Sequence, residues 1–320
     1  MAPPVIVLDR VAKRFAGHTA VDALSLEVSA GLIYGLLGPN GAGKTTTIRM
    51  IMGIIEPDQG AVRLFGDQTR MANRARNHSA RIGYLPEERG LYRKMRVLDV
   101  LVFLAEMKGV ERRVARVKAT EWLERLGLSD WRLRRIDELS KGMQQKVQFI
   151  STILHQPELV VLDEPFAGLD PVNTQVLKDT VLELRRHGVT ILFSTHIMEQ
   201  AEKLCDELCI IARGRRLVEG ALSDIKRTHS GHHLTIGFDG SPGAATQIFA
   251  DKALVKKIDD YGQYAELELA VGADPQQILR ELIGSGARLS RFELTEPSLN
   301  KIFIDLVGPE AARAEARPGA

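Results

Sequence analysis

Cysteine is scarce in this sequence: Cys205 and Cys209 are the only two in 320 residues. The pair has no histidine or third cysteine close by at the spacing of a metal site. We therefore predict that both are small buried hydrophobic side chains without a redox or metal role.

The sequence also lacks long hydrophobic runs and an excess of charge of one sign. No apolar run approaches the ~18 residues that cross a bilayer, and residues 1–9 lack the basic start and apolar core of a signal peptide. We therefore expect a cytoplasmic protein without a membrane span, which reaches the inner face of the membrane only through a partner. A formal net charge of +2 gives no strong field and no reason to expect nucleic acid.

Length and composition indicate an ordinary globular chain. Hydrophobic residues make up 44% of it and charged residues 26%. Its length predicts two domains, or one large domain with an appendix.

Residues 38–45 fill every fixed position of the phosphate loop G-x-x-x-x-G-K-[ST]. A buried strand is predicted before the loop at Ile33–Leu37, and a helix after it over residues 46–53. Lys44 would reach the β- and γ-phosphates of a nucleotide, and Thr45 would bind Mg²⁺. The predicted nucleotide-binding residues here are Gly38, Pro39, Asn40, Gly41, Ala42, Gly43, Lys44, Thr45 and Thr46.

Two further apolar runs end in polar residues. The run at 159–162 leads into Asp163 and Glu164, and the run at 190–195 leads into His196. Ligands bind beyond the carboxyl ends of parallel strands, so we expect these side chains at the same sheet edge as the phosphate loop. Asp163 is predicted to bind Mg²⁺, and Glu164 to orient or deprotonate an attacking water. For His196 a functional role is favoured over a core role.

Two positions remain open on their residues alone. Phe15 lies on a turn between two predicted strands, where it either covers a base or belongs to the core. Ser140 begins a helix and either caps it locally or belongs to an anion site. A helical insertion is predicted over about residues 88–145.

From residue 5 to residue 220 the chain resembles the nucleotide-binding subunit of ATP-binding cassette (ABC) transporters. The motifs that carry the resemblance are the phosphate loop, a signature motif at 139–144, Asp163 with Glu164, a D-loop at 168–170 and a switch histidine at His196. The resemblance implies an α/β phosphate-loop NTPase core with a helical subdomain. It also implies ATP and Mg²⁺ as cofactors.

The resemblance further implies a head-to-tail homodimer with ATP clamped between the two copies. Phe15 would stack on adenine, and Ser140 and Gly142 would meet the γ-phosphate held by the other copy. Asp170 would link the two sites, and His196 would touch the γ-phosphate near the attacking water. Hydrolysis would reopen the dimer and drive an integral membrane permease.

The sequence departs from the family pattern at two places. Glu87 stands where the family commonly has glutamine, and the signature reads Ser-Lys-Gly-Met in place of Ser-Gly-Gly-Gln. A carboxylate can still bind Mg²⁺ or its water, so we predict that Glu87 keeps the cofactor-sensing role. Lys141 adds a positive charge beside the expected γ-phosphate.

We predict an ABC ATPase domain over residues 1–225, a linker over 226–233, a small α+β domain over 234–308 and a disordered tail over 309–320. The α+β domain resembles the accessory domain of bacterial exporters similar to sodium-efflux and drug-efflux ATPase subunits. Together these features predict the ATPase subunit of an exporter of ions or drugs. The alternatives are an ABC protein acting on ribosomes and a phosphate-loop kinase.

Overall fold

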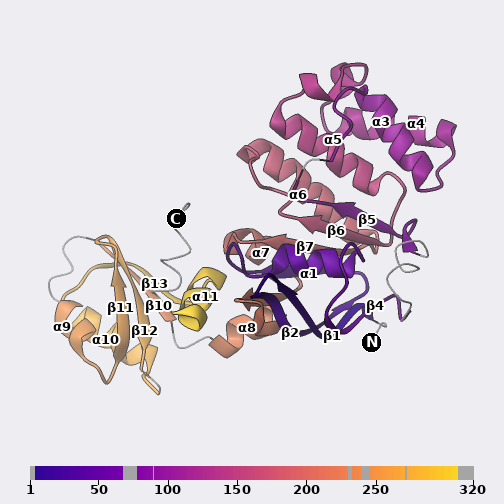
Figure 1. The fold of residues 1–320 in the computed structure, drawn as a ribbon. Coiled ribbons are helices and arrows are strands. Elements are labelled where there is room, and N and C mark those ends of the chain that lie inside the picture. The colour runs from indigo at the N-terminus through magenta and orange to yellow at the C-terminus, as the bar shows by residue number, and fades with distance from the viewer. Residues whose placement is uncertain are drawn as a thin grey trace. The chain divides into compact units, whose positions relative to one another are not determined.

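The computed structural model describes residues 4–67, 78–88, 90–229, 233–239, 245–270 and 272–308 (Figure 1). The chain divides into two compact units, with the boundary between Ala221 and Leu222. Each unit has its own hydrophobic core.

The first unit is built on a six-stranded sheet of order β5-β6-β7-β3-β8-β9. All neighbouring strands are parallel except β8 and β9, which are antiparallel. The strands are β3 (Ile33–Leu37), β5 (Ile82–Leu85), β6 (Leu159–Asp163), β7 (Thr190–Thr195), β8 (Glu207–Ala212) and β9 (Arg215–Ala221). Every residue of β3, β6 and β7 is buried, as their uninterrupted apolar runs predict. Because these three strands are parallel neighbours, their carboxyl ends meet at one edge.

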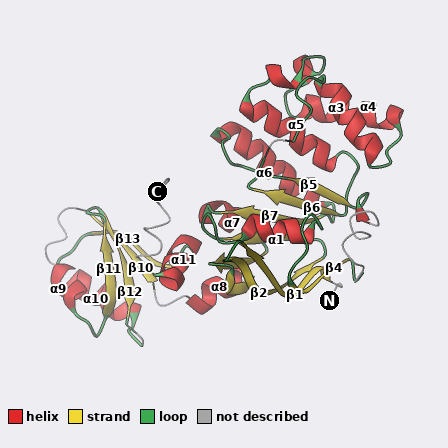
Figure 2. Ribbon diagram, in the orientation of Figure 1, coloured by secondary structure: helices red, strands yellow, loops and turns green. Residues whose placement is uncertain are grey.

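A second, antiparallel sheet of order β2-β1-β4 completes the core. It contains β1 (Pro4–Phe15), β2 (His18–Ser29) and β4 (Gln59–Leu64). Helix α1 (Lys44–Ile51) lies between the two sheets, as Figure 2 shows, and buries Ile48, Met50 and Ile51 there.

Helices α3 (Val97–Met107) and α4 (Arg112–Arg125), with 3₁₀ turns at Ser129–Trp131 and Ile136–Glu138, form the predicted helical insertion. Helix α5 (Lys141–Ile153) follows them, α6 (Pro171–Arg186) connects β6 to β7, and α7 (Met198–Leu204) connects β7 to β8. Helix α5 runs from the insertion, predicted to end near residue 145, back to the start of β6.

The second unit is an α+β module around an antiparallel sheet of order β11-β12-β10-β13. Its strands are β10 (His233–Phe238), β11 (Val255–Asp260), β12 (Tyr264–Leu269) and β13 (Leu289–Thr295), and its helices are α8 (Leu222–His229), α9 (Ala245–Ala250), α10 (Pro275–Gly284) and α11 (Leu299–Val307).

The predicted linker over residues 226–233 is wrong at its start, because α8 continues to His229. Ile225 is buried, and basic side chains in the last turn face the negative end of the helix. The polar composition indicated a linker at this short helix, which is stabilised by packing and by the charges at its end. His233 begins β10, whereas residues 230–232 and the predicted tail over 309–320 lie outside the described residues.

Cys205 and Cys209 are free and buried, as predicted, and burial raises the pKa of both thiols. Within the described ranges, no helix is long and apolar enough to cross a membrane.

Candidate active site

The phosphate loop connects β3 to α1 and requires glycine at two positions for steric reasons. Gly43 has φ 101°, and a Cβ there would lie 2.4 Å from the Ala20 carbonyl oxygen. A Cβ on Gly38, with φ 154°, would lie 2.2 Å from the Ile211 carbonyl oxygen. The loop therefore packs backbone against backbone at the amino end of α1, where free N–H groups favour an anion.

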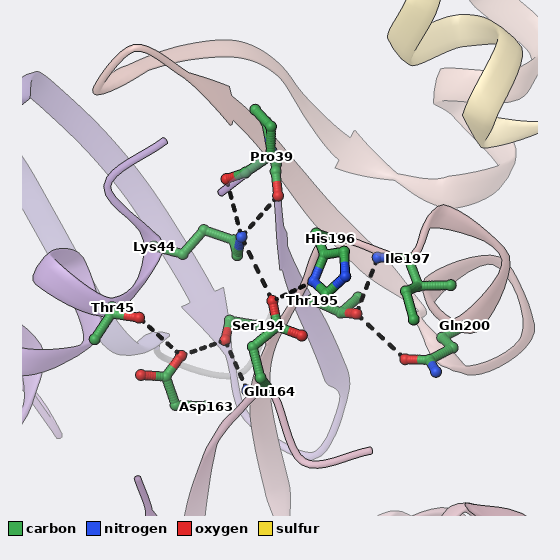
Figure 3. A network of polar contacts seen from close by, with 11 residues as sticks. Pro39, Lys44, Thr45, Asp163, Glu164, Ser194, Thr195, His196, Ile197 and Gln200 are labelled. Carbon is green, nitrogen blue, oxygen red and sulfur yellow. Dashed lines mark hydrogen bonds and ion pairs between the residues drawn. The ribbon is translucent and has the colours of Figure 1, made fainter. Parts of the chain in front are cut away.

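Lys44 is held at the centre of the site (Figure 3). Its Nζ donates hydrogen bonds to the carbonyl oxygens of Gly38 at 2.7 Å and Pro39 at 3.1 Å, and lies 3.5 Å from Glu164 Oε1. Burial lowers the pKa of Lys44, and the Glu164 carboxylate opposes that shift. The ammonium is desolvated and bound mostly to carbonyl oxygens, which a phosphate oxygen can replace.

Asp163 ends β6 beside Thr45. Its Oδ1 accepts hydrogen bonds from Ser194 Oγ at 2.5 Å and from Thr45 Oγ1 at 3.3 Å, whereas Oδ2 is buried without a partner. Burial raises the pKa of Asp163, and the hydrogen bond from Ser194 opposes the shift. An unpartnered carboxylate oxygen next to a threonine hydroxyl is a donor set that fits Mg²⁺.

Glu164 points toward both Lys44 and His196. His196 Nδ1 lies 2.9 Å from Glu164 Oε1, and the Glu164 N–H donates to Ser194 Oγ at 3.1 Å. Glu164 has φ 47°, a left-handed conformation that costs a residue with a side chain about 1–3 kcal/mol. Its carboxylate is thus fixed beside the loop by several contacts, which suits a group that aligns water.

A cavity of about 420 Å³ brings eight of the predicted residues together. It is lined by His18, Ala20, Asn40, Gly41, Gly43, Lys44, Thr45, Thr46, Glu87 and Glu164. His18 and Ala20 were missed from the sequence, since nothing in the pattern of β2 distinguishes them from other strand residues. Phe15 pairs with His18 across the two strands but is 45% exposed and is not among the lining residues.

Three predicted residues also lie outside the cavity lining, at helix starts. Ser140 caps α5, with Oγ accepting from the Met143 N–H at 3.3 Å, and Asp170 caps α6, with Oδ1 accepting from the Asn173 N–H at 2.9 Å. The latter bond lowers the pKa of Asp170. Gly142 has space for a Cβ, with Leu169 Cδ2 the nearest atom at 3.5 Å. Ser140 therefore caps its helix locally, and it does not line the cavity of its own chain.

Comparisons with known proteins assign this arrangement. The ABC transporter family profile matches residues 21–167, and the profile of the C-terminal domain of ATP-binding proteins like DrrA1-3 matches residues 220–307. The uncharacterized ABC transporter ATP-binding protein YhaQ of Bacillus subtilis (strain 168) is 44% identical over 304 residues, which cover 95% of this chain and 99% of that protein. The chain belongs to the family of ABC transporter ATP-binding proteins.

Further relatives of this ABC transporter subunit extend the match. Nod factor export ATP-binding protein I of Rhizobium sp. (strain N33) is 33% identical over 97% of this chain and 99% of its own. The solved structure of the ATP binding subunit of an ABC transporter superposes with a TM-score of 0.64 at 32% identity, covering 70% of this chain and 92% of its own. The ADP conformation of MJ1267, an ATP-binding cassette of an ABC transporter, gives a TM-score of 0.60 at 26% identity, with coverages of 70% and 93%.

These matches confirm the predicted phosphate-loop fold and the ATPase class. ABC transporter ATP-binding subunits bind ATP or ADP, couple ATP hydrolysis to transport and work with membrane permease components. Membership of this family excludes the alternative of a phosphate-loop kinase.

Proposed function

We propose that two copies of this ABC transporter subunit hydrolyse Mg-ATP at their shared interface and thereby drive a separate membrane exporter. One observation carries the proposal: the cavity contains the phosphate loop, Glu87 and Glu164, whereas Ser140, Gly142 and Asp170 stand apart from it at helix starts. Ser140, Gly142 and Asp170 thus suit contact with a nucleotide that is bound to another copy.

Within one copy, each residue has a role that its contacts support. Lys44 and the loop N–H groups bind the β- and γ-phosphates, while Thr45 and Asp163, with Glu87, hold Mg²⁺. When bound, Mg²⁺ neutralises charge on the phosphate oxygens. Glu164 orients the attacking water and accepts a proton from it.

His196 and Phe15 complete the copy's own contribution. Since His196 Nδ1 is 2.9 Å from Glu164 Oε1, the imidazole holds that carboxylate and also reaches the γ-phosphate. Phe15 is 45% exposed, so its ring has room to stack on adenine.

Across the interface, the second copy supplies the start of α5. Ser140 and the small Gly142 contact the γ-phosphate there, and the helix end adds a favourable positive potential. Asp170 begins α6 and links the two sites.

Export is supported by the second unit and by the relatives. Residues 220–307 match the DrrA1-3-like C-terminal domain, and several relatives are named Nod factor export proteins. We propose ions or drugs as cargo classes, selected by the permease, with this subunit attached through it at the inner membrane face. Co-purification of the permease from native membranes tests the partnership, and recovery of an import system would contradict export.

The nucleotide-bound dimer is tested with Glu164→Gln. This substitution keeps the side chain's shape but removes the base, so ATP should bind and persist. We expect a dimer by light scattering at saturating ATP and magnesium, and no phosphate release. Adding Lys44→Ala should return the protein to a monomer because ATP no longer binds tightly. A Glu164→Gln protein that remains monomeric with both ligands present overturns the shared site.

A further inference from the structure

Helix α5 carries polar side chains on its buried face. Gln145, Gln148 and Thr152 are 5%, 4% and 3% exposed, and they follow one another at intervals of three and four residues on one face. Burying such groups is unfavourable unless each finds a hydrogen-bond partner. Their partners are therefore informative.

The two glutamines donate to backbone carbonyls near the active site. Gln145 Nε2 lies 3.2 Å from the Pro165 carbonyl oxygen, and Gln148 Nε2 lies 3.4 Å from that of Glu88. Thr152 Oγ1 donates to the Gln148 carbonyl oxygen of its own helix at 3.0 Å and lies 3.4 Å from the carbonyl oxygen of Tyr84 in β5. The face of α5 thus reaches the segments that follow Glu164 and flank Glu87.

The contact of Gln145 is the one closest to the proposed chemistry. Pro165 directly follows Glu164, which adopts φ 47°, and the Ala167 N–H closes the turn onto the Glu164 carbonyl oxygen at 3.2 Å. The proline ring already fixes φ of Pro165. Anchoring the Pro165 carbonyl fixes ψ as well, so Gln145 defines the path of the turn that presents Glu164.

The turn is thereby held from two elements. Ser194 in β7 receives the Glu164 N–H at 3.1 Å, and Gln145 in α5 binds the Pro165 carbonyl. Gln145 is 5% exposed, its amide binds the Pro165 carbonyl, and it is not among the residues that line the cavity.

We propose that Gln145 is a positioning residue for Glu164 of the same chain. The inference rests on the proposed role of Glu164 as the base. Loss of the amide donor leaves ATP binding intact and misaligns the carboxylate, so it lowers kcat and leaves KM for ATP unchanged.

Gln145→Met tests this because methionine matches the length of glutamine but donates no hydrogen bond. Small misplacements of a reacting group cost up to about 100-fold, and we expect kcat to fall by about 10- to 100-fold. Ser151→Ala is the matched control on α5, since its hydroxyl donates within the helix, to the Gln148 carbonyl oxygen at 2.7 Å. An unchanged kcat in Gln145→Met, or an equal loss of ATP affinity, overturns the proposal.

Gln145→Glu adds a readout that a purely structural role does not move. An ionised carboxylate cannot donate to the Pro165 carbonyl, but a protonated one can. The ratio of kcat for Gln145→Glu to that for Gln145→Met should therefore rise as pH falls. A ratio independent of pH contradicts a donor role.

Mixed dimers of two differently tagged copies identify which site is affected. In the reference, one copy is wild type and the other carries Glu164→Gln, so one base is active. Placing Gln145→Met in the copy with the active base should lower the rate, whereas placing it in the Glu164→Gln copy should leave the reference rate. Loss in the second arrangement, or in neither, overturns the proposal. A wild-type protein without ATPase activity would instead refute the proposed function.

Discussion

A single hydroxyl organises the two acidic residues of the site. Ser194 Oγ donates to Asp163 Oδ1 and accepts from the Glu164 N–H. The adjacent carboxylates consequently diverge: Asp163 lies beside Thr45, and Glu164 lies beside Lys44 and His196. Neighbouring residues with the same charge can therefore take different roles.

Glu87 lines the cavity and stands where the family commonly has glutamine. Glu87→Gln keeps an oxygen for Mg²⁺ or its water and should retain magnesium-dependent ATPase activity. Glu87→Ala removes it and should lower activity at limiting magnesium by about 10- to 100-fold, as loss of supporting metal contacts does. Phosphate release over a magnesium titration measures both, with Glu88→Ala as the control. Full activity in Glu87→Ala would refute the prediction.

His155 should make the stability of the first unit depend on pH. Burial lowers its pKa to about 4, and the ammonium of Lys108 adds to the effect. Between its unfolded pKa of about 6.5 and about 4, the unfolded chain binds a proton that the folded chain does not, so stability falls as pH falls. The loss is at most about 3 kcal/mol, and screening at this partly exposed site reduces it to about 1–2 kcal/mol.

His155→Gln keeps a donor for the Ile82 carbonyl but removes the titration. It should match the wild type near pH 7.5 and unfold at higher urea near pH 5. Trp122 and Trp131 are the only tryptophans and both lie in the first unit, so their fluorescence reports this transition. Exposed His187→Gln is the control. A wild type and a variant with parallel pH profiles would exclude His155 as the cause.

At the scale of elements, α5 and α11 begin in the same way. Ser140 accepts from the Met143 N–H at 3.3 Å, and Ser298 accepts from the Lys301 N–H at 3.2 Å. Either serine replaced by alanine should cost its unit about 0.5–2 kcal/mol in urea unfolding. Only Ser140→Ala should also weaken ATP-dependent dimerisation in the Glu164→Gln background, measured by light scattering. Equal dimerisation in both variants would confine Ser140 to capping.

Elements defined by their own residues were predictable, and those defined by distant contacts were not. Strands β3, β6 and β7 are fully buried, so their apolar runs were sufficient. Strand β1 continues past register shifts near Asp9 and Arg10 that interrupt its apolar pattern, so its length depends on pairing with β2 and β4. In the site, the phosphate-loop motif predicted Lys44, and the apolar run at 159–162 predicted Asp163 and Glu164 at its end. His18 enters the cavity only because β2 passes the phosphate loop, which is a tertiary contact.

At the scale of the whole molecule, the residues that line the cavity belong to the first unit. Every described lining residue of the cavity lies within residues 18–164, and each unit has a separate core. A chain ending at Ala221 should therefore keep the ATP dissociation constant of the full chain. ATP at 100 times that constant should stabilise both by about 2.7 kcal/mol, seen as equal thermal shifts. A shift lost on truncation, with Lys44→Ala as the unresponsive control, would assign part of the site to the second unit.

Gly142 has a consequence for how this protein tolerates change. Its backbone needs no positive φ, and a methyl group there would make ordinary contacts with Leu169 and Asn173. The chain's own folding therefore places almost no constraint on this glycine, and any constraint must come from a molecule that approaches it. A variant library sorted by cellular abundance should accept Gly142→Ala, whereas one sorted by transport should reject it.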